Sequence, residues 1–126
     1  MALTLDAGAL IAIDRGDLAV HVLLKESVRR RQVVTVPAPV VGQVWRDGSR
    51  QARLAKVLKA CRVEPTSEED ARAAGVLLGK AGGVDIVDAL VVLGAVRRGD
   101  EVVTSDPSDI AALVDASERS VTLTVV

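Results

Sequence analysis

Short runs of β-branched and aliphatic residues alternate along this chain with longer segments that have helical periodicity. The runs at 2–5, 33–36, 62–64, 101–104 and 120–125 read as strands, because they are short, largely apolar and bounded by turn residues or helical segments. The segments between them repeat apolar residues at intervals of three and four, as amphipathic helices do. Alternating strands and helices form a parallel sheet with helices on both faces. We therefore expect an α/β sandwich, with a central parallel sheet of four or five strands flanked by helices.

The core of this sandwich has to be aliphatic. Hydrophobic residues make up 49% of the 126 residues, yet Phe and Tyr are absent and Trp45 is the only aromatic residue. A chain of this length supports one domain, so we expect residues 1–126 to form a single domain. No apolar run approaches the ~20 residues of a membrane span, and the single cysteine, Cys61, has no partner for an internal disulfide. We expect a cytoplasmic protein with no membrane association.

Two helices carry local signals that the structure can test. Thr66 and Glu69 have the spacing of a capping box, which predicts that a helix starts there and runs towards Gly79. The segment 17–31 reads as an amphipathic helix, because it has apolar residues at helical spacing and charges elsewhere. These apolar residues are Leu18, Val22, Leu23 and Val28.

Three aspartates stand where a parallel sheet places its ligand site. Asp6 and Asp106 each follow an expected strand, and Asp88 lies in the first turn of the helix after Gly82 and Gly83. Ligands of such sheets bind beyond the carboxyl ends of the strands. Each carboxylate could instead cap a helix, but Ser or Thr would cap equally well, and three neighbouring carboxylates repel one another. A divalent cation removes that conflict, and Mg²⁺ or Mn²⁺ suits oxygen ligands.

Basic side chains gather in two stretches, at 25–31 and 46–62, although the net charge is only −1. An enzyme that uses a metal ion to act on a polyanion needs basic residues beside its acidic site. A solvated helix face explains the same stretches without any function. The charge pattern alone leaves both interpretations open.

Four short motifs occur in the order seen in PIN-domain nucleases. Each places a polar or acidic residue after a strand or near a helix start: Leu5-Asp6-Ala7, then Gln43 on the helix after Pro37-Ala38-Pro39, then Val87-Asp88-Ala89-Leu90, then Val103-Thr104-Ser105-Asp106 with Asp109-Ile110. Over essentially its whole length the chain resembles the small ribonuclease toxins of bacterial VapBC toxin–antitoxin pairs. The resemblance implies a single PIN-like domain over 1–126, built as a three-layer sandwich.

That resemblance also implies an activity, a cofactor and a set of residues. The implied activity is that of a metal-dependent endoribonuclease toxin, with Mg²⁺ or Mn²⁺ at an acidic site. Asp6, Asp88 and Asp106 match three of the four acidic positions of the family and are the implied catalytic and metal-binding residues. Asp109 matches a flanking acidic position. Asp85, one turn before Asp88, either caps the helix or binds the metal through water.

Gln43 departs from the family pattern, which has a glutamate at this position. Its amide offers a carbonyl oxygen without a charge, so Gln43 is a weaker candidate metal ligand. Asp47, about one turn further along, is a less favoured substitute. This departure keeps open an alternative function, that of a catalytically weakened PIN-domain module that binds RNA or an antitoxin without efficient cleavage. A receiver-type signalling domain fits less well, because no phosphoacceptor aspartate follows the third expected strand.

An RNA substrate would have to be bound with almost no aromatic stacking. Arg46 and Arg50 are the candidate substrate-binding residues nearest the expected site, and the hydroxyls of Thr104 and Ser105 are further candidates. His21 lies in the middle of a helix and is not expected to act as a general base. The resemblance implies two protein partners, a second copy of this chain in a homodimer and a VapB-like antitoxin.

Overall fold

The computed structural model describes residues 2–126, which form five strands and seven helices. All strand pairs are parallel, in the order β3-β2-β1-β4-β5. The strands are β1 (Leu3–Leu5), β2 (Val34–Pro37), β3 (Arg62–Glu64), β4 (Glu101–Thr104) and β5 (Leu123–Val125). The helices are α1 (Ala7–Asp14), α2 (Leu18–Arg29), α3 (Ala38–Val44), α4 (Ala52–Ala60), α5 (Glu68–Ala81), α6 (Ile86–Arg98) and α7 (Pro107–Ala116). The α/β expectation is confirmed, with five strands.

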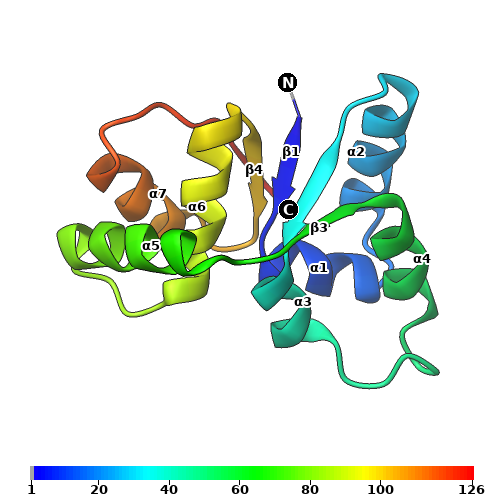
Figure 1. Ribbon diagram of the computed structural model, residues 1–126. Helices are drawn as coiled ribbons and strands as arrows, with labels where there is room; N and C mark the ends of the chain where they lie inside the picture. The colour runs from blue at the N-terminus through cyan, green and yellow to red at the C-terminus, as the bar shows by residue number, and fades with distance from the viewer. Residues whose placement is uncertain (1) are drawn as a thin grey trace.

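Helices cover both sides of the sheet, as Figure 1 shows. Helices α5, α6 and α7 pack against one another on one side, and α6 also contacts β1, β2 and β4. Helices α1 to α4 lie on the other side, where α1 packs against α2, α3 and α4. These three layers are the expected sandwich. None of the described helices is long and apolar enough to cross a membrane.

The core between the layers is aliphatic, as the composition requires. Leu5, Val36, Val102 and Val103 are fully buried in the sheet, and they pack with Leu, Ile, Val and Ala side chains from the helices. Trp45 does not belong to this core and is 37% exposed. Small aliphatic side chains therefore fill the interior without help from a large ring.

The strand order creates a switch point between β1 and β4. From β1 the chain proceeds to β2 and β3 on one side, and it then returns through α5 and α6 to β4 and β5 on the other. In parallel sheets the crevice beyond the carboxyl ends of two such strands is the usual ligand site. Asp6 directly follows β1, and Asp106 follows β4 after one intervening residue. The topology thus brings two distant aspartates to one edge.

The structure differs from three local expectations. The capping box of α5 is formed by Ser67 and Asp70, one residue later than expected: the Asp70 amide donates to Ser67 Oγ at 3.0 Å, and the Ser67 amide donates to Asp70 Oδ2 at 3.2 Å. Helix α5 also continues past Gly79 to Ala81 and is capped by Gly82, whose positive φ of 69° suits a glycine.

Asp47 lies in a loop rather than on α3, and its carboxylate accepts hydrogen bonds from Ser49.

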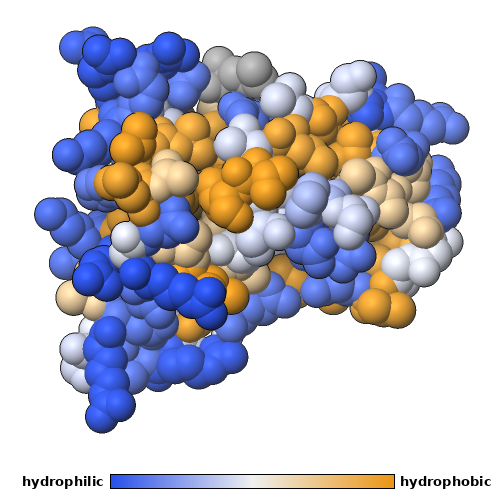
Figure 2. All heavy atoms as spheres, turned by 180° about the vertical axis from the view of Figure 1, so that it is seen from behind, coloured by the Kyte–Doolittle hydropathy of each residue, from blue (hydrophilic) through white to orange (hydrophobic). Residues whose placement is uncertain are grey.

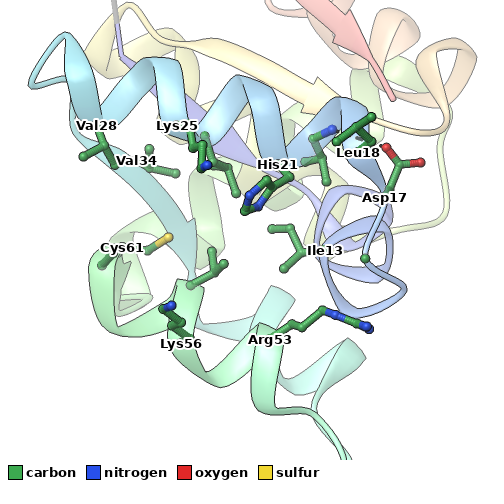
Figure 3. Close-up of a pocket in the computed structure, with 15 residues that line it drawn as sticks. Ile13, Asp17, Leu18, His21, Lys25, Val28, Val34, Arg53, Lys56 and Cys61 are labelled. Atoms are coloured by element: carbon green, nitrogen blue, oxygen red, sulfur yellow. Dashed lines mark hydrogen bonds between the residues drawn. The ribbon is translucent and has the colours of Figure 1, made fainter.

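The helix expected over 17–31 is present as α2, but of its four marked apolar residues only Leu23 packs against the core. Leu18, Val22 and Val28 are 73%, 56% and 66% exposed, whereas Val20 and Ser27 are buried. Apolar residues occur on two faces of this helix, so periodicity alone does not identify the face that packs against the core. Leu18 and Val28 line a groove of about 600 Å³ that faces α4 (Figure 3). On the side of α2 and α4, at the left of Figure 2, apolar surface is bordered by hydrophilic side chains.

Candidate metal centre

Asp6 is a buried carboxylate at the carboxyl end of β1. It is 4% exposed and caps α1 by accepting a hydrogen bond from the Ala9 amide at 2.9 Å. Burial raises the pKa of Asp6 above its usual value, and the negative charge of Asp106 acts in the same direction. Hydrogen bonds from Thr104 and from the first turn of α1 lower that pKa without cancelling the effect of burial. Asp6 is therefore held firmly, and no positive charge among residues 2–126 offsets its burial.

Asp88 lies in the first turn of α6, where the negative charges of neighbouring acids raise its pKa. Burial raises the pKa of Asp88 to about 6, together with the negative charges of Asp85, Asp6, Asp109 and Asp106. Asp85 makes the capping bonds of α6, accepting from the amides of Val87 at 2.8 Å and Asp88 at 3.2 Å. The perturbation of Asp88 by four carboxylates shows that five acids from three segments converge on one region.

Asp106 precedes α7 but does not cap it. Its side chain makes no capping hydrogen bond, and its Oδ1 atom instead accepts from the Ser108 hydroxyl at 3.1 Å. Charge and hydrogen bonding from Asp106 raise the pKa of the neighbouring Asp109. The capping interpretation of Asp106 is thus wrong, and an exposed carboxylate remains at the cleft.

Thr104 joins the two halves of the acidic region. Its buried hydroxyl accepts a hydrogen bond from the Asp106 amide at 2.9 Å and also hydrogen bonds to Asp6. Ser105 next to it is exposed and packs against Gly8, where an added methyl group would overlap the Ser105 side chain. Sequence reasoning missed Gly8, although a glycine in the first turn of an apolar helix was an available signal.

The remaining candidates lie in a different place. Gln43, Arg46 and Arg50 are exposed and line a depression of about 500 Å³ between α1 and α3. None of the three contributes to the pKa shifts of Asp6 or Asp88. The polar residues that follow β2 thus line a depression of their own and do not join the cluster of acids.

The acidic residues have the chemistry, although not the closed arrangement, of a metal centre. Among residues 2–126, no three His, Cys, Asp or Glu side chains are placed closely enough to hold a metal ion. Asp6 is buried and Asp88 is half-buried, and their carboxylates with that of Asp106 offer an all-oxygen donor set, which fits Mg²⁺ or Mn²⁺.

No family model and no curated protein matches this sequence. Solved structures do match it along most of its length. The VapBC2 complex of Rickettsia felis, bound to a promoter DNA fragment, aligns with a TM-score of 0.74 at 15% identity, covering 100% of this chain and 99% of that chain. The fold is PIN-like.

Two further structures have the same PIN-like fold. VapC20 of Mycobacterium tuberculosis, a sarcin–ricin loop cleaving toxin, aligns with a TM-score of 0.67 at 20% identity over 88% of this chain and 95% of that chain. FitAcB of Neisseria gonorrhoeae aligns with a TM-score of 0.67 at 16% identity, covering 96% of this chain and 95% of that chain. At such identities the likeness establishes the PIN-like fold, so any statement about activity has to rest on the site itself.

Proposed function

We propose that the protein is a metal-dependent endoribonuclease toxin of a toxin–antitoxin pair, acting on RNA in the cytoplasm. The observation that carries this proposal is the convergence of Asp6, Asp88 and Asp106 at the switch point of a PIN-like fold, with the pKa of Asp88 raised to about 6. Solved structures of the same fold include a sarcin–ricin loop cleaving toxin and several toxin–antitoxin assemblies, which supports the same reaction class.

The chain's own residues would divide the work of phosphodiester hydrolysis. Asp6, Asp88 and Asp106 would hold Mg²⁺ or Mn²⁺, with Asp85 and Asp109 contributing through water. Such an ion supplies Lewis acidity to the phosphate and to the attacking water. Thr104 fixes Asp6 through its hydroxyl and holds the turn after β4 by accepting from the Asp106 amide.

Basic residues on the loop after α3 have a separate task in this proposal. Arg46 and Arg50 are exposed on the loop after α3, where their guanidinium groups are placed to donate hydrogen bonds to an RNA substrate. Ser105 is exposed, and its hydroxyl lies against Gly8 at the start of α1. We propose all three as substrate-binding residues.

Cleavage of a mixed RNA pool tests the proposed activity. We expect fragments with the wild-type protein in Mg²⁺ or Mn²⁺, and no fragments after chelation or with Asp6→Asn. Asn retains the capping ability of Asp at the start of α1, so this variant should fold. Asp115→Asn, an exposed acid near the end of α7, is the matched control and should cleave normally. Identical fragments from all variants would show that this site does not catalyse the reaction.

The second candidate function is a weakened module that binds RNA or an antitoxin without cutting. The observation that favours it is Gln43, an uncharged side chain where the resembling family has a carboxylate. RNA binding by the wild-type protein, without any divalent-dependent cleavage in the pool assay, would select this candidate over the nuclease.

We also propose that a partner protein, in the role of an antitoxin, docks in the groove between α2 and α4. Apolar side chains such as Leu18, Leu24 and Val57 line the groove, and Figure 3 shows Lys25 and Lys56 on its opposite walls. His21, Asp17 and Arg53 complete the polar lining, so the net charge of the rim is positive. A matching segment would be an amphipathic helix with acidic residues beside its apolar face.

Charge reversal tests this docking surface. We expect Lys56→Glu to weaken binding of the protein encoded by the adjacent reading frame by ~10-fold or more, because a repulsive charge enters the rim. Lys80→Glu, at an exposed position on α5, is the control and should bind normally. Equal affinities of the two variants would exclude the α2–α4 groove. The proposed homodimer is tested separately by sedimentation of the wild-type protein.

A further inference from the structure

We propose that the depression between α1 and α3 binds one unpaired nucleobase of the RNA, and that Gln43 contacts this base instead of the metal ion. The inference rests on the proposed nuclease function and adds a substrate subsite to it. We call the depression the α1–α3 pocket. It has a volume of about 500 Å³, and Ile11, Asp14, Gln43, Val44, Arg46 and Arg50 line most of it.

The pocket lies along α1, the helix that Asp6 caps. Asp6 caps α1, and Ile11 lies five residues further along, a rise of about 7.5 Å in an α-helix. Helix α3 follows directly on β2, which pairs with β1 in the sheet, so both helices start at the same sheet edge. We therefore expect a nucleotide adjoining a phosphate at the acidic cleft to extend along α1 into the α1–α3 pocket.

Gln51 gives the pocket a fixed shape. It is only 8% exposed, and its Oε1 atom accepts hydrogen bonds from the amides of Arg46 at 2.8 Å and Asp47 at 3.0 Å. Its Nε2 atom donates to the Val44 carbonyl at 3.0 Å and to Asp14 Oδ2 at 3.3 Å. One buried amide thus ties the loop to both helices, so the loop needs little reordering when a ligand binds.

The charges and shape of the pocket favour a base over a phosphate. Arg46 and Arg50 are offset by Asp14 and Asp47, so the lining has no net positive charge to hold a phosphate. Hydrogen bonds from Ser49 lower the pKa of Asp47, which keeps this carboxylate ionised at neutral pH. The apolar side chain of Ile11 offers contact to a flat ring, and the surrounding groups include both donors and acceptors.

Guanine has the hydrogen-bonding pattern that fits this lining. Its O6 and N7 atoms accept from an arginine fork, and its N1–H and N2–H groups donate to a carboxylate. Arg50 is available, since among residues 2–126 it forms one ion pair, a long contact of 3.9 Å to Asp47. Gln43 offers a donor and an acceptor without a third negative charge in the pocket, which a glutamate would add. We expect guanine to be preferred at one position next to the cut.

Sequencing the ends produced from a random RNA pool tests the subsite. Wild-type protein should enrich guanine at one position beside the cut, and Gln43→Ala and Arg50→Ala should each reduce this enrichment ~10-fold. Arg72→Ala, an exposed arginine on α5, is the matched control and should leave the enrichment unchanged. If Gln43→Glu cleaves better at low Mg²⁺ and keeps the same base preference, the proposal is overturned. Residue 43 would then act as a metal ligand and not as a base contact.

A binding measurement separates this proposal from the nuclease itself. The Asp106→Asn protein is titrated in Mg²⁺ with four short RNAs that differ in one base, and fluorescence anisotropy reports affinity without cleavage. Tighter binding of the guanine RNA, lost when Gln43→Ala is added, supports the pocket even if no variant cleaves. Wild-type cleavage with no preference for any base, and equal affinities for the four RNAs, overturns the pocket and leaves the nuclease assignment standing.

Discussion

Replacing Asp88 with asparagine is expected to reduce RNA cleavage at least ~100-fold, because the variant loses one of the three carboxylates proposed to hold the metal ion. Asparagine keeps the size of the side chain and its place in the first turn of α6. Single-turnover cleavage of a defined RNA at saturating enzyme measures the effect. An Asp88→Asn protein that cleaves at the wild-type rate would remove Asp88 from the catalytic residues.

The same substitution is expected to make the metal-free protein more stable above pH 6. Burial and neighbouring carboxylates raise the pKa of Asp88 from 3.8 to about 6 in the folded protein, so the folded state binds the proton more tightly than the unfolded state. The stability that the folded protein gains from this tighter proton binding is complete below pH ~4 and is lost as the pH rises through ~6.

Urea denaturation without divalent ions measures this gain. We expect Asp88→Asn to exceed wild type by about 1 kcal/mol at pH 7.5, a value kept small because solvent screens a half-exposed side chain. The two proteins should be equally stable near pH 4, and Mg²⁺ should stabilise the wild type more. If the wild type instead gains stability relative to Asp88→Asn as the pH rises, the proposed repulsion between Asp88 and its neighbouring carboxylates is contradicted.

Replacing Arg98 with alanine is expected to lower the free energy of unfolding by about 3 kcal/mol. Arg98 Nε donates to Asp100 Oδ2 at 2.8 Å, and its Nη2 atom donates to Thr4 Oγ1 at 3.0 Å. A third contact is an ion pair with Glu64. The Asp100 side chain is 3% exposed, so the substitution leaves a buried carboxylate without its positive partner. Urea denaturation at pH 7 measures the loss.

Arg97 provides the matched control, since it precedes Arg98 on α6 and forms an ion pair with Asp70 at the surface. Its side chain is 46% exposed, so Arg97→Ala should cost less than about 1 kcal/mol. Equal losses from the two alanine variants would mean that the network around Arg98 contributes no more than a surface ion pair.

Much of the fold follows from local sequence patterns. The valines of 34–36 and the run 101–104 mark two strands without ambiguity, and the proline and glycine positions mark helix ends. Asp6 and Asp106 are placed at the site edge by chain order alone, because a parallel sheet brings the carboxyl ends of its strands together. The expected α/β sandwich and its single acidic region therefore required no knowledge of long-range contacts.

Features that depend on contacts between distant residues could not be predicted. The hydrogen bond between Thr4 and Asp100 joins residues 96 apart, and nothing near either residue signals it. The contact between Gly8 and Ser105 is likewise set by how α1 packs against the turn after β4. Helix α2 has apolar residues on two faces, and only the packing of its neighbours decides that Leu18 stays exposed. Polar networks and surface grooves belong to tertiary packing, which periodicity does not encode.

The most direct test of the account is a manganese soak of crystals of the wild-type protein, with anomalous diffraction recorded to locate the ion. We predict a manganese peak beside the carboxylates of Asp6, Asp88 and Asp106, with at least one carboxylate oxygen at about 2.2 Å. Crystals that take up manganese elsewhere, or that show no ion between these three aspartates, would contradict the claim that they form one metal centre.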